Sequence, residues 1–272
     1  MKKILKQFGY IKRGILGFFQ NNFDKLQNLS KKFGSFEIGK SIKEKPIQCF
    51  KIGNGPCKLL CVSGIHGNEI GTVKLAHCFL NWAHNNIDQF KNYTLFVVPC
   101  LNPDGYYLAC KNPDYFNGGK IGRFNVNNVD LNRNFDTPSF TQKSIWSFGK
   151  NYKENVEVFC GNYGNSEPEI KALTELIKDK KIQIVFMFHN AGNDVMGNKN
   201  KLSQRLTKIY SEKTGFKYVS DEDWKELKQT GTAKEWCDLH DIAYVEVEGT
   251  TRWGSDWKKQ KKAIKSIMSM NI

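Results

Sequence analysis

Short apolar segments and amphipathic helical segments alternate along most of this chain. The apolar segments cover residues 59–62, 93–100 and 182–188, and residues 243–248 are a further predicted strand that carries two glutamates. Continuously apolar segments of this length are typical of strands that are buried on both faces of a parallel sheet. Helical patterns separate them, at residues 70–84, 166–180, 202–214 and 257–268. We therefore predict an α/β fold in which helices cover both faces of a mostly parallel sheet.

Other segments refine this outline. Residues 35–52 alternate in character and are predicted to form a hairpin. Residues 111–165 are rich in Asn, Gly and Pro, so we expect long irregular loops, which usually serve a function when they occur inside a compact domain. The helix that follows has a start signal, with Ser166 as N-cap, Pro168 in the first turn and Glu169 at the capping-box position.

The first 30 residues form a distinct predicted segment. Their apolar side chains recur at spacings of three and four, which indicates an amphipathic helix despite several glycines. We expect its apolar face to pack on the rest of the chain, and the alternative is peripheral contact with an anionic membrane. This divides the chain into a helical segment at 1–30 and a single domain at 31–272.

The net charge is strongly positive, because 41 Lys and Arg face 27 Asp and Glu, which leaves +14. Such a charge raises the question of a nucleic acid partner. The basic residues are mostly lysines spread along the chain, and no nucleic-acid-binding signature accompanies them. We therefore expect no nucleic acid partner, and we interpret the charge as favouring anionic substrates.

The chain has eight cysteines, and none of them forms a C-x-x-C pair. This pattern argues against zinc ribbons and thioredoxin-like chemistry. A chain of 272 residues can bury a large core without disulfides. We therefore expect a reducing, cytoplasmic location.

Three residues are candidates for a metal site. His66 and Glu69 have H-x-x-E spacing directly after a predicted strand, and His189 follows another predicted strand. Ligands bind beyond the carboxyl ends of strands in parallel sheets, so the three side chains can converge there. Two histidines and one glutamate are a common ligand set for catalytic zinc, which lowers the pKa of water to about 7. Donor atoms separated by more than about 6 Å would exclude such a site, since bonds to zinc are near 2 Å.

Four strings in order surround these residues: Gly-Ile-His-Gly-Asn-Glu at 64–69, Asn-Pro-Asp-Gly-Tyr at 102–106, Val-Asp-Leu-Asn-Arg-Asn-Phe at 129–135 and Ser-Glu-Pro-Glu at 166–169. Together they resemble the zinc carboxypeptidase family, and within it the bacterial murein peptide amidases. The resemblance extends to nearly residue 250 when His189 and the strand of Glu246 are included.

The resemblance implies a mixed, mostly parallel eight-stranded sheet between helices, with one zinc ion per chain held by His66, Glu69 and His189. One departure concerns the turn before Asp130, where these amidases usually have glycine and this chain has Asn128. Because asparagine also tolerates positive φ angles, we expect the turn to be kept.

The resemblance also implies the remaining catalytic groups. Arg123 resembles the arginine that stabilises the oxyanion, while Asn132 and Arg133 resemble the pair that binds the terminal carboxylate of the substrate. Glu246 resembles the general base. Glu248 lies two residues further along the same predicted strand, so both carboxylates point to one face. Glu248 therefore remains the alternative base, an ion-pair partner, or a residue that supports the site.

The function that the resemblance implies is zinc-dependent hydrolysis of a peptide or amide bond beside a residue with a free carboxylate. The expected substrate is a peptide or an acyl-amino acid, and cell-wall peptides are favoured. An alternative is an N-acyl amino acid deacylase of the aspartoacylase and succinylglutamate desuccinylase type, which shows similar H-G-N-E and D-L-N-R strings. An alternative of another class is a catalytically inactive binding relative, which would lack a ligand or the base.

Overall fold

The structure is a computed structural model that describes residues 34–112, 120–148, 153–225 and 228–270. An eight-stranded sheet forms its centre, in the order β1-β2-β4-β3-β7-β10-β8-β9. The strands are β1 (Ser35–Lys40), β2 (Pro46–Ile52), β3 (Cys57–Val62), β4 (Tyr93–Val98), β7 (Ile184–Asn190), β8 (Asp194–Gly197), β9 (Lys217–Val219) and β10 (Ala243–Gly249). Strands β4, β3, β7 and β10 are parallel to one another, and β8 pairs in parallel with β9. The antiparallel pairs are β1 with β2, β2 with β4, and β8 with β10. The predicted mixed, mostly parallel sheet is therefore confirmed.

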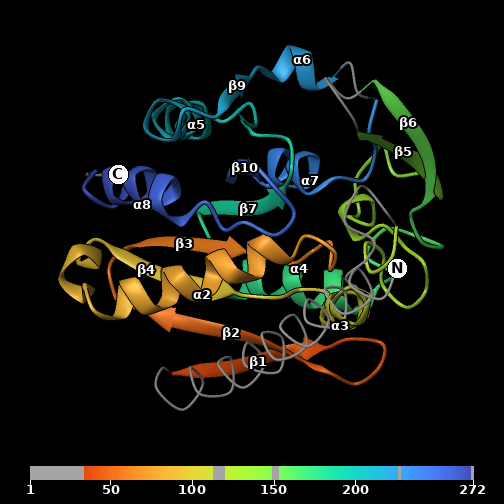
Figure 1. Ribbon diagram of the computed structural model, residues 1–272, viewed down its shortest axis with the longest axis horizontal. Coiled ribbons are helices and arrows are strands. Elements are labelled where there is room, and N and C mark those ends of the chain that lie inside the picture. Colours follow the sequence, from red (N-terminus) through yellow and green to blue (C-terminus); the bar gives the residue numbers. More distant parts are fainter. Residues whose placement is uncertain (1–33, 113–119, 149–152, 226–227, 271–272) are drawn as a thin grey trace, which may run out of the picture.

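Helices cover both faces of this sheet (Figure 1). One apolar cluster joins β3 to α2 (Ile70–His84), α5 (Lys201–Thr214) and α8 (Trp257–Met268) through residues such as Leu59 and Cys61. A second cluster joins the opposite face of β3 to α4 (Pro168–Lys180) and α7 (Ala233–Leu239) through Leu60 and Val62. Successive side chains of a strand point to opposite faces, so a strand covered on both sides must be continuously apolar.

Several predicted elements are confirmed with their bounds. The predicted helices at 70–84 and 257–268 match α2 and α8, and β1 and β2 form the predicted hairpin. Asn128 has a φ of 61°, which confirms the expected turn before Asp130. Within the described residues, no helix is both long and apolar enough to cross a bilayer.

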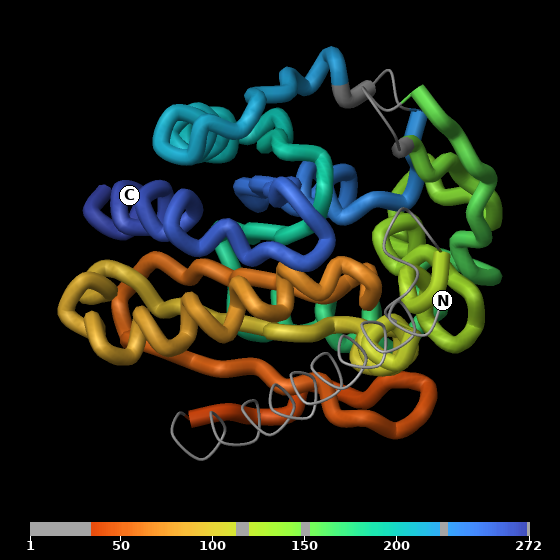
Figure 2. The backbone as a smooth tube through the Cα atoms, in the orientation of Figure 1, coloured from red at the N-terminus to blue at the C-terminus, as the bar shows by residue number. Residues whose placement is uncertain are grey.

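The expectation of irregular loops over residues 111–165 is wrong in part. This region contains an antiparallel hairpin of β5 (Lys143–Phe148) and β6 (Glu154–Phe159), whose few buried side chains include Trp146. The hairpin lies at the end of the sheet toward which β3 and β7 run (Figures 1 and 2). The many Asn, Gly and Pro residues of this region concealed the two short strands.

A helix over Pro103–Lys111, α3, was not predicted. Asn102 caps it, because its side chain accepts a hydrogen bond from Gly105 N. Short elements complete the fold: the 3₁₀ turns η1 (Ile87–Phe90) and η2 (Leu131–Arg133), and α6 (Asp221–Lys225).

The predicted N-cap of α4 is also wrong. The helix begins at Pro168, its N-cap residue is Glu167, and no side chain caps it. The Ser166 hydroxyl instead donates to Glu167 Oε1 and lies 2.9 Å from Asn134 Nδ2. Glu169 faces Asn125 rather than closing a capping box. These tertiary partners outcompete the local cap.

The predicted helical segment at residues 1–30 lies outside the described residues. The same holds for its predicted contact with a membrane and for the division of the chain at residue 30.

Candidate metal centre and active site

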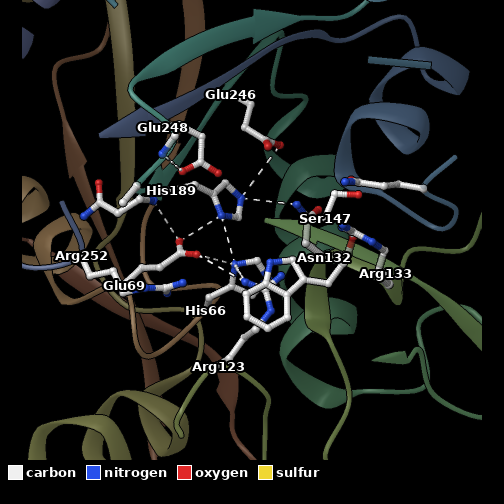
Figure 3. Close-up of a pocket in the computed structure, with 15 residues that line it drawn as sticks. His66, Glu69, Arg123, Asn132, Arg133, Ser147, His189, Glu246, Glu248 and Arg252 are labelled. Carbon is white, nitrogen blue, oxygen red and sulfur yellow. Dashed lines mark hydrogen bonds and ion pairs between the residues drawn. The ribbon is translucent and has the colours of Figure 1, made fainter. Parts of the chain in front are cut away.

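His66, Glu69 and His189 meet at the carboxyl ends of neighbouring parallel strands. His66 follows β3, Glu69 directly precedes α2, and His189 lies near the end of β7. One donor atom from each lies within 4.8 Å of the others, well inside the limit set by the sequence argument. Glu69 Oε1 is 2.9 Å from His66 Nδ1, and Glu69 Oε2 is 3.1 Å from His189 Nδ1 (Figure 3). The predicted convergence of the three side chains is confirmed.

The chemistry of this cluster fits a zinc ion. All three side chains are buried, and the donor set has two imidazole nitrogens and a carboxylate without a thiolate. Burial raises the pKa of Glu69, but His66 and His189 outweigh burial and lower it. Burial lowers the pKa of His189, but Glu246 and Glu69 raise it to about 9. The carboxylates around the histidine thus create a negative potential that a divalent cation would neutralise.

Asp130 contacts the cluster through His66 and also binds Arg123. It was not among the site residues predicted from the sequence. Its Oδ1 lies 3.0 Å from His66 Nε2 and 3.1 Å from Asn132 N, while its Oδ2 accepts from Arg123 Nε at 3.1 Å and Nη2 at 2.8 Å. Burial raises the pKa of Asp130, but Arg123 and His66 hold it well below its usual range. Because an ionised carboxylate only accepts, His66 donates from Nε2, which leaves Nδ1 to face the metal position. The sequence offered one indication of this role, because Asp130 lies two residues before the predicted site residue Asn132.

Arg123 lies beside the cluster. Its Nη1 is 3.6 Å from Glu69 Oε1 and 3.3 Å from His66 Nδ1. The guanidinium carbon lies 4.1 Å from the centre of the Trp146 ring, which supports the arginine by a cation–π contact. Trp146 comes from the β5–β6 hairpin, so this support was not predictable from the loop assignment.

Asn132 and Arg133 line the same pocket, to the right of the triad in Figure 3. Arg133 donates to its neighbour's carbonyl, Asn132 O, at 2.7 Å and to Ile145 O at 3.1 Å. Asn132 Oδ1 accepts from Ala233 N, and its Nδ2 lies 3.4 Å from His189 Nε2. These bonds fix the orientation of both side chains before a ligand arrives.

Glu246 and Glu248 both line the pocket, which confirms that they share one face of β10. Glu246 is buried, accepts a hydrogen bond from Tyr244 Oη and lies 3.9 Å from His189 Nε2. Glu248 lies opposite His189 in the strand register and accepts from Gly192 N at 3.1 Å. Figure 3 shows both carboxylates above the triad, so position in the pocket does not separate them.

Comparisons with known proteins agree with this geometry. Murein peptide amidase A of Escherichia coli K12 is 30% identical over 133 residues, which are 48% of this chain and 48% of that protein. Gamma-D-glutamyl-L-diamino acid endopeptidase 1 of Lysinibacillus sphaericus is 25% identical over 248 residues, which cover 75% of this chain and 60% of that protein. The chain therefore spans less than two thirds of the length of either relative.

A solved structure shows the same fold. The murein-tripeptide amidase of Escherichia coli O157 superposes with a TM-score of 0.68 at 22% sequence identity, over 88% of this chain and 93% of that one. The sequence profile of the family described as zinc carboxypeptidase matches residues 21–264. This match includes the triad and every residue that lines the pocket around it. The chain belongs to the zinc carboxypeptidase family.

Proposed function

We propose that this protein hydrolyses a peptide or amide bond next to a residue with a free carboxylate, with one zinc ion per chain. The observation that carries the proposal is the convergence of His66, Glu69 and His189 in one pocket. Arginine, asparagine and glutamate side chains line the same pocket, so groups for binding an anion and for moving a proton lie beside the metal position.

Each group has a role that its surroundings support. Zinc, when bound, supplies Lewis-acid activation of the attacking water and of the scissile carbonyl. Arg123 stabilises the negative charge that develops on the carbonyl oxygen, because Asp130 and Trp146 hold its guanidinium beside the triad. Asn132 and Arg133 bind the terminal carboxylate of the substrate, since a guanidinium beside an amide can form several parallel hydrogen bonds with it.

Glu246 is the proposed general base, which takes a proton from the attacking water and returns it to the leaving amine. Its carboxylate is buried near His189, and the Tyr244 hydroxyl orients it. The matched test compares Glu246→Gln with Glu248→Gln. Glu246→Gln should keep its zinc while kcat falls by about 10²- to 10⁴-fold, as is typical of lost general-base catalysis. Full activity of Glu246→Gln together with an inactive Glu248→Gln would transfer the role to Glu248.

Peptides with the carboxylates of cell-wall fragments are the proposed substrates. This is supported by the likeness to murein peptide amidase A and by the positive charge of the chain. We also propose a cytoplasmic location, because a chain of 272 residues buries a large core without needing disulfide bonds. Metal analysis should find one zinc per chain. A screen of murein peptides, C-terminal peptides and N-acyl amino acids should then show hydrolysis of the peptides, and turnover of N-acyl amino acids alone would refute the proposed substrate class.

A further inference from the structure

Arg252 lies in the loop between β10 and α8 and lines the pocket of the triad. Its carbonyl oxygen accepts a hydrogen bond from Gly71 N at 2.6 Å, which ties the loop to the start of α2. A Cβ at Gly71 would lie 2.1 Å from the Gly254 carbonyl oxygen, so only glycine permits this close approach. Lys74 Nζ also donates to Trp253 O at 3.0 Å. The backbone that carries Arg252 is therefore firmly attached beside Glu69.

The guanidinium of Arg252 has no direct anionic partner among the described residues. Its Nη1 is buried and has no hydrogen-bond partner there. Burial lowers the pKa of Arg252 and the nearby Arg123 lowers it further, while Glu69 and Glu248 raise it. A buried donor that finds no acceptor is destabilising, and an acceptor on a bound ligand would remove this cost. The arginine therefore offers an unused, charged donor inside the site.

The position of Arg252 in the pocket places it near the acyl side of a bound substrate. In Figure 3, Arg252 lies on one side of the triad, and Asn132 and Arg133 lie on the opposite side. A substrate with its terminal carboxylate on Arg133 and its scissile carbonyl at the triad extends its acyl part toward Arg252. The residue that donates the carbonyl thus meets Arg252, whereas the residue that leaves as an amine meets Arg133.

We infer that Arg252 is a specificity-determining residue that binds a carboxylate on the acyl side of the scissile bond. The inference rests on the proposed function and narrows its substrate class to peptides that are anionic on both sides of the bond. A γ-linked glutamyl residue meets this requirement, because it keeps its α-carboxylate close to the scissile γ-amide. The name of the Lysinibacillus sphaericus relative describes cleavage after such a residue.

The experiment uses two substrates that differ only in this carboxylate. One is γ-D-glutamyl-L-lysine, and the other is the same dipeptide with the α-carboxyl group of its glutamyl residue converted to an amide. The wild-type zinc protein should cleave the first with a kcat/KM about 10- to 100-fold higher, the range expected for a hydrogen-bonded charge pair. This comparison needs no variant, so it remains decisive even if substitutions at residue 252 impair folding.

Variants then assign the preference to Arg252. Arg252→Gln should lower kcat/KM for the free carboxylate by about 10- to 100-fold and leave the amide substrate nearly unchanged. Arg252→Lys should restore part of the loss, because it keeps the charge without the planar fork. Arg205→Gln, at an exposed residue of α5, is the matched control and should behave as the wild type.

The outcomes separate this inference from the proposed function. Equal cleavage of both substrates by the wild type, or an equal loss on both in Arg252→Gln, refutes the role of Arg252. If the zinc-loaded protein cleaves peptides with uncharged acyl residues but neither glutamyl substrate, the inference is wrong and the proposed function stands. If it cleaves no peptide at all, the proposed function fails and the inference fails with it.

Discussion

Replacing Asp130 with asparagine should weaken both the fold and the metal site. The two carboxylate oxygens face donors only, with His66 Nε2 and Asn132 N on one oxygen and two guanidinium nitrogens of Arg123 on the other. Asparagine has almost the same shape, but one of its two polar ends is an NH₂ group. Whichever way the amide is turned, its NH₂ group meets a pair of donors, so two of the four hydrogen bonds are lost.

The size of the effect follows from this geometry. Asp130 is fully buried, so its replacement removes the nearer carboxylate from the buried Arg123 guanidinium and leaves Glu69, at 3.6 Å, as its remaining ion-pair partner. Removing one partner of a buried ion pair typically costs about 3–5 kcal/mol of unfolding free energy. Loss of the carboxylate that orients a metal-binding histidine typically lowers metal affinity by about 10- to 100-fold. We expect both effects in Asp130→Asn.

Two measurements test the prediction. Denaturant unfolding of the zinc-free protein measures the loss of stability, and competition with a chelating dye measures the zinc affinity. Asp179→Asn is the control, because Asp179 is an exposed residue of α4 whose ion pair with Lys180 lies at the surface. It should change stability by less than about 0.5 kcal/mol. An Asp130→Asn protein that matches this control in stability and binds zinc as tightly as the wild type would refute the reasoning.

Three further predictions concern a buried carboxyl group, the carboxylate-binding arginine and the metal. Burial raises the pKa of Glu169 from 4.5 to about 7, so the folded protein retains a proton that the unfolded chain releases, and stability falls as pH rises across this interval. Glu169→Gln should therefore gain about 3 kcal/mol relative to the wild type between pH 4 and pH 8 in unfolding experiments, and a pH-independent difference would contradict this. Arg133→Ala should raise KM for peptides with a free terminal carboxylate, and an equal effect on their C-terminal amides would argue against carboxylate binding. Removal of zinc with a chelator should abolish peptide hydrolysis, and readdition of one equivalent should restore it; activity that persists in verified zinc-free protein would exclude the proposed mechanism.

The sequence by itself determined the class of fold and the position of the metal site. Continuous apolar strands alternating with amphipathic helices are properties of short segments, so local patterns were enough to predict a sheet covered on both faces. The strand-to-helix turn that carries His66 and Glu69 is also local, because the two residues are three apart. His189 was placed correctly because parallel strands end at one edge of the sheet.

Contacts between distant segments were beyond the reach of local patterns. The β5–β6 hairpin lies in a region rich in Asn, Gly and Pro, and no local pattern relates Trp146 to Arg123, which lies 23 residues earlier. The predicted Ser166 cap of α4 is wrong because Asn134, distant in sequence, lies against the Ser166 hydroxyl.

Only the tertiary structure decided which charged side chains of the site lie next to one another. Asp130 binds His66, 64 residues away, and Arg252 reaches the pocket of Glu69 from the far end of the chain. The residues next to each of these charged groups in the sequence do not reveal whether the group has a partner in the folded protein. Its role depends on the low-dielectric surroundings and on the partners that the order of strands brings together, and neither is a property of neighbouring residues.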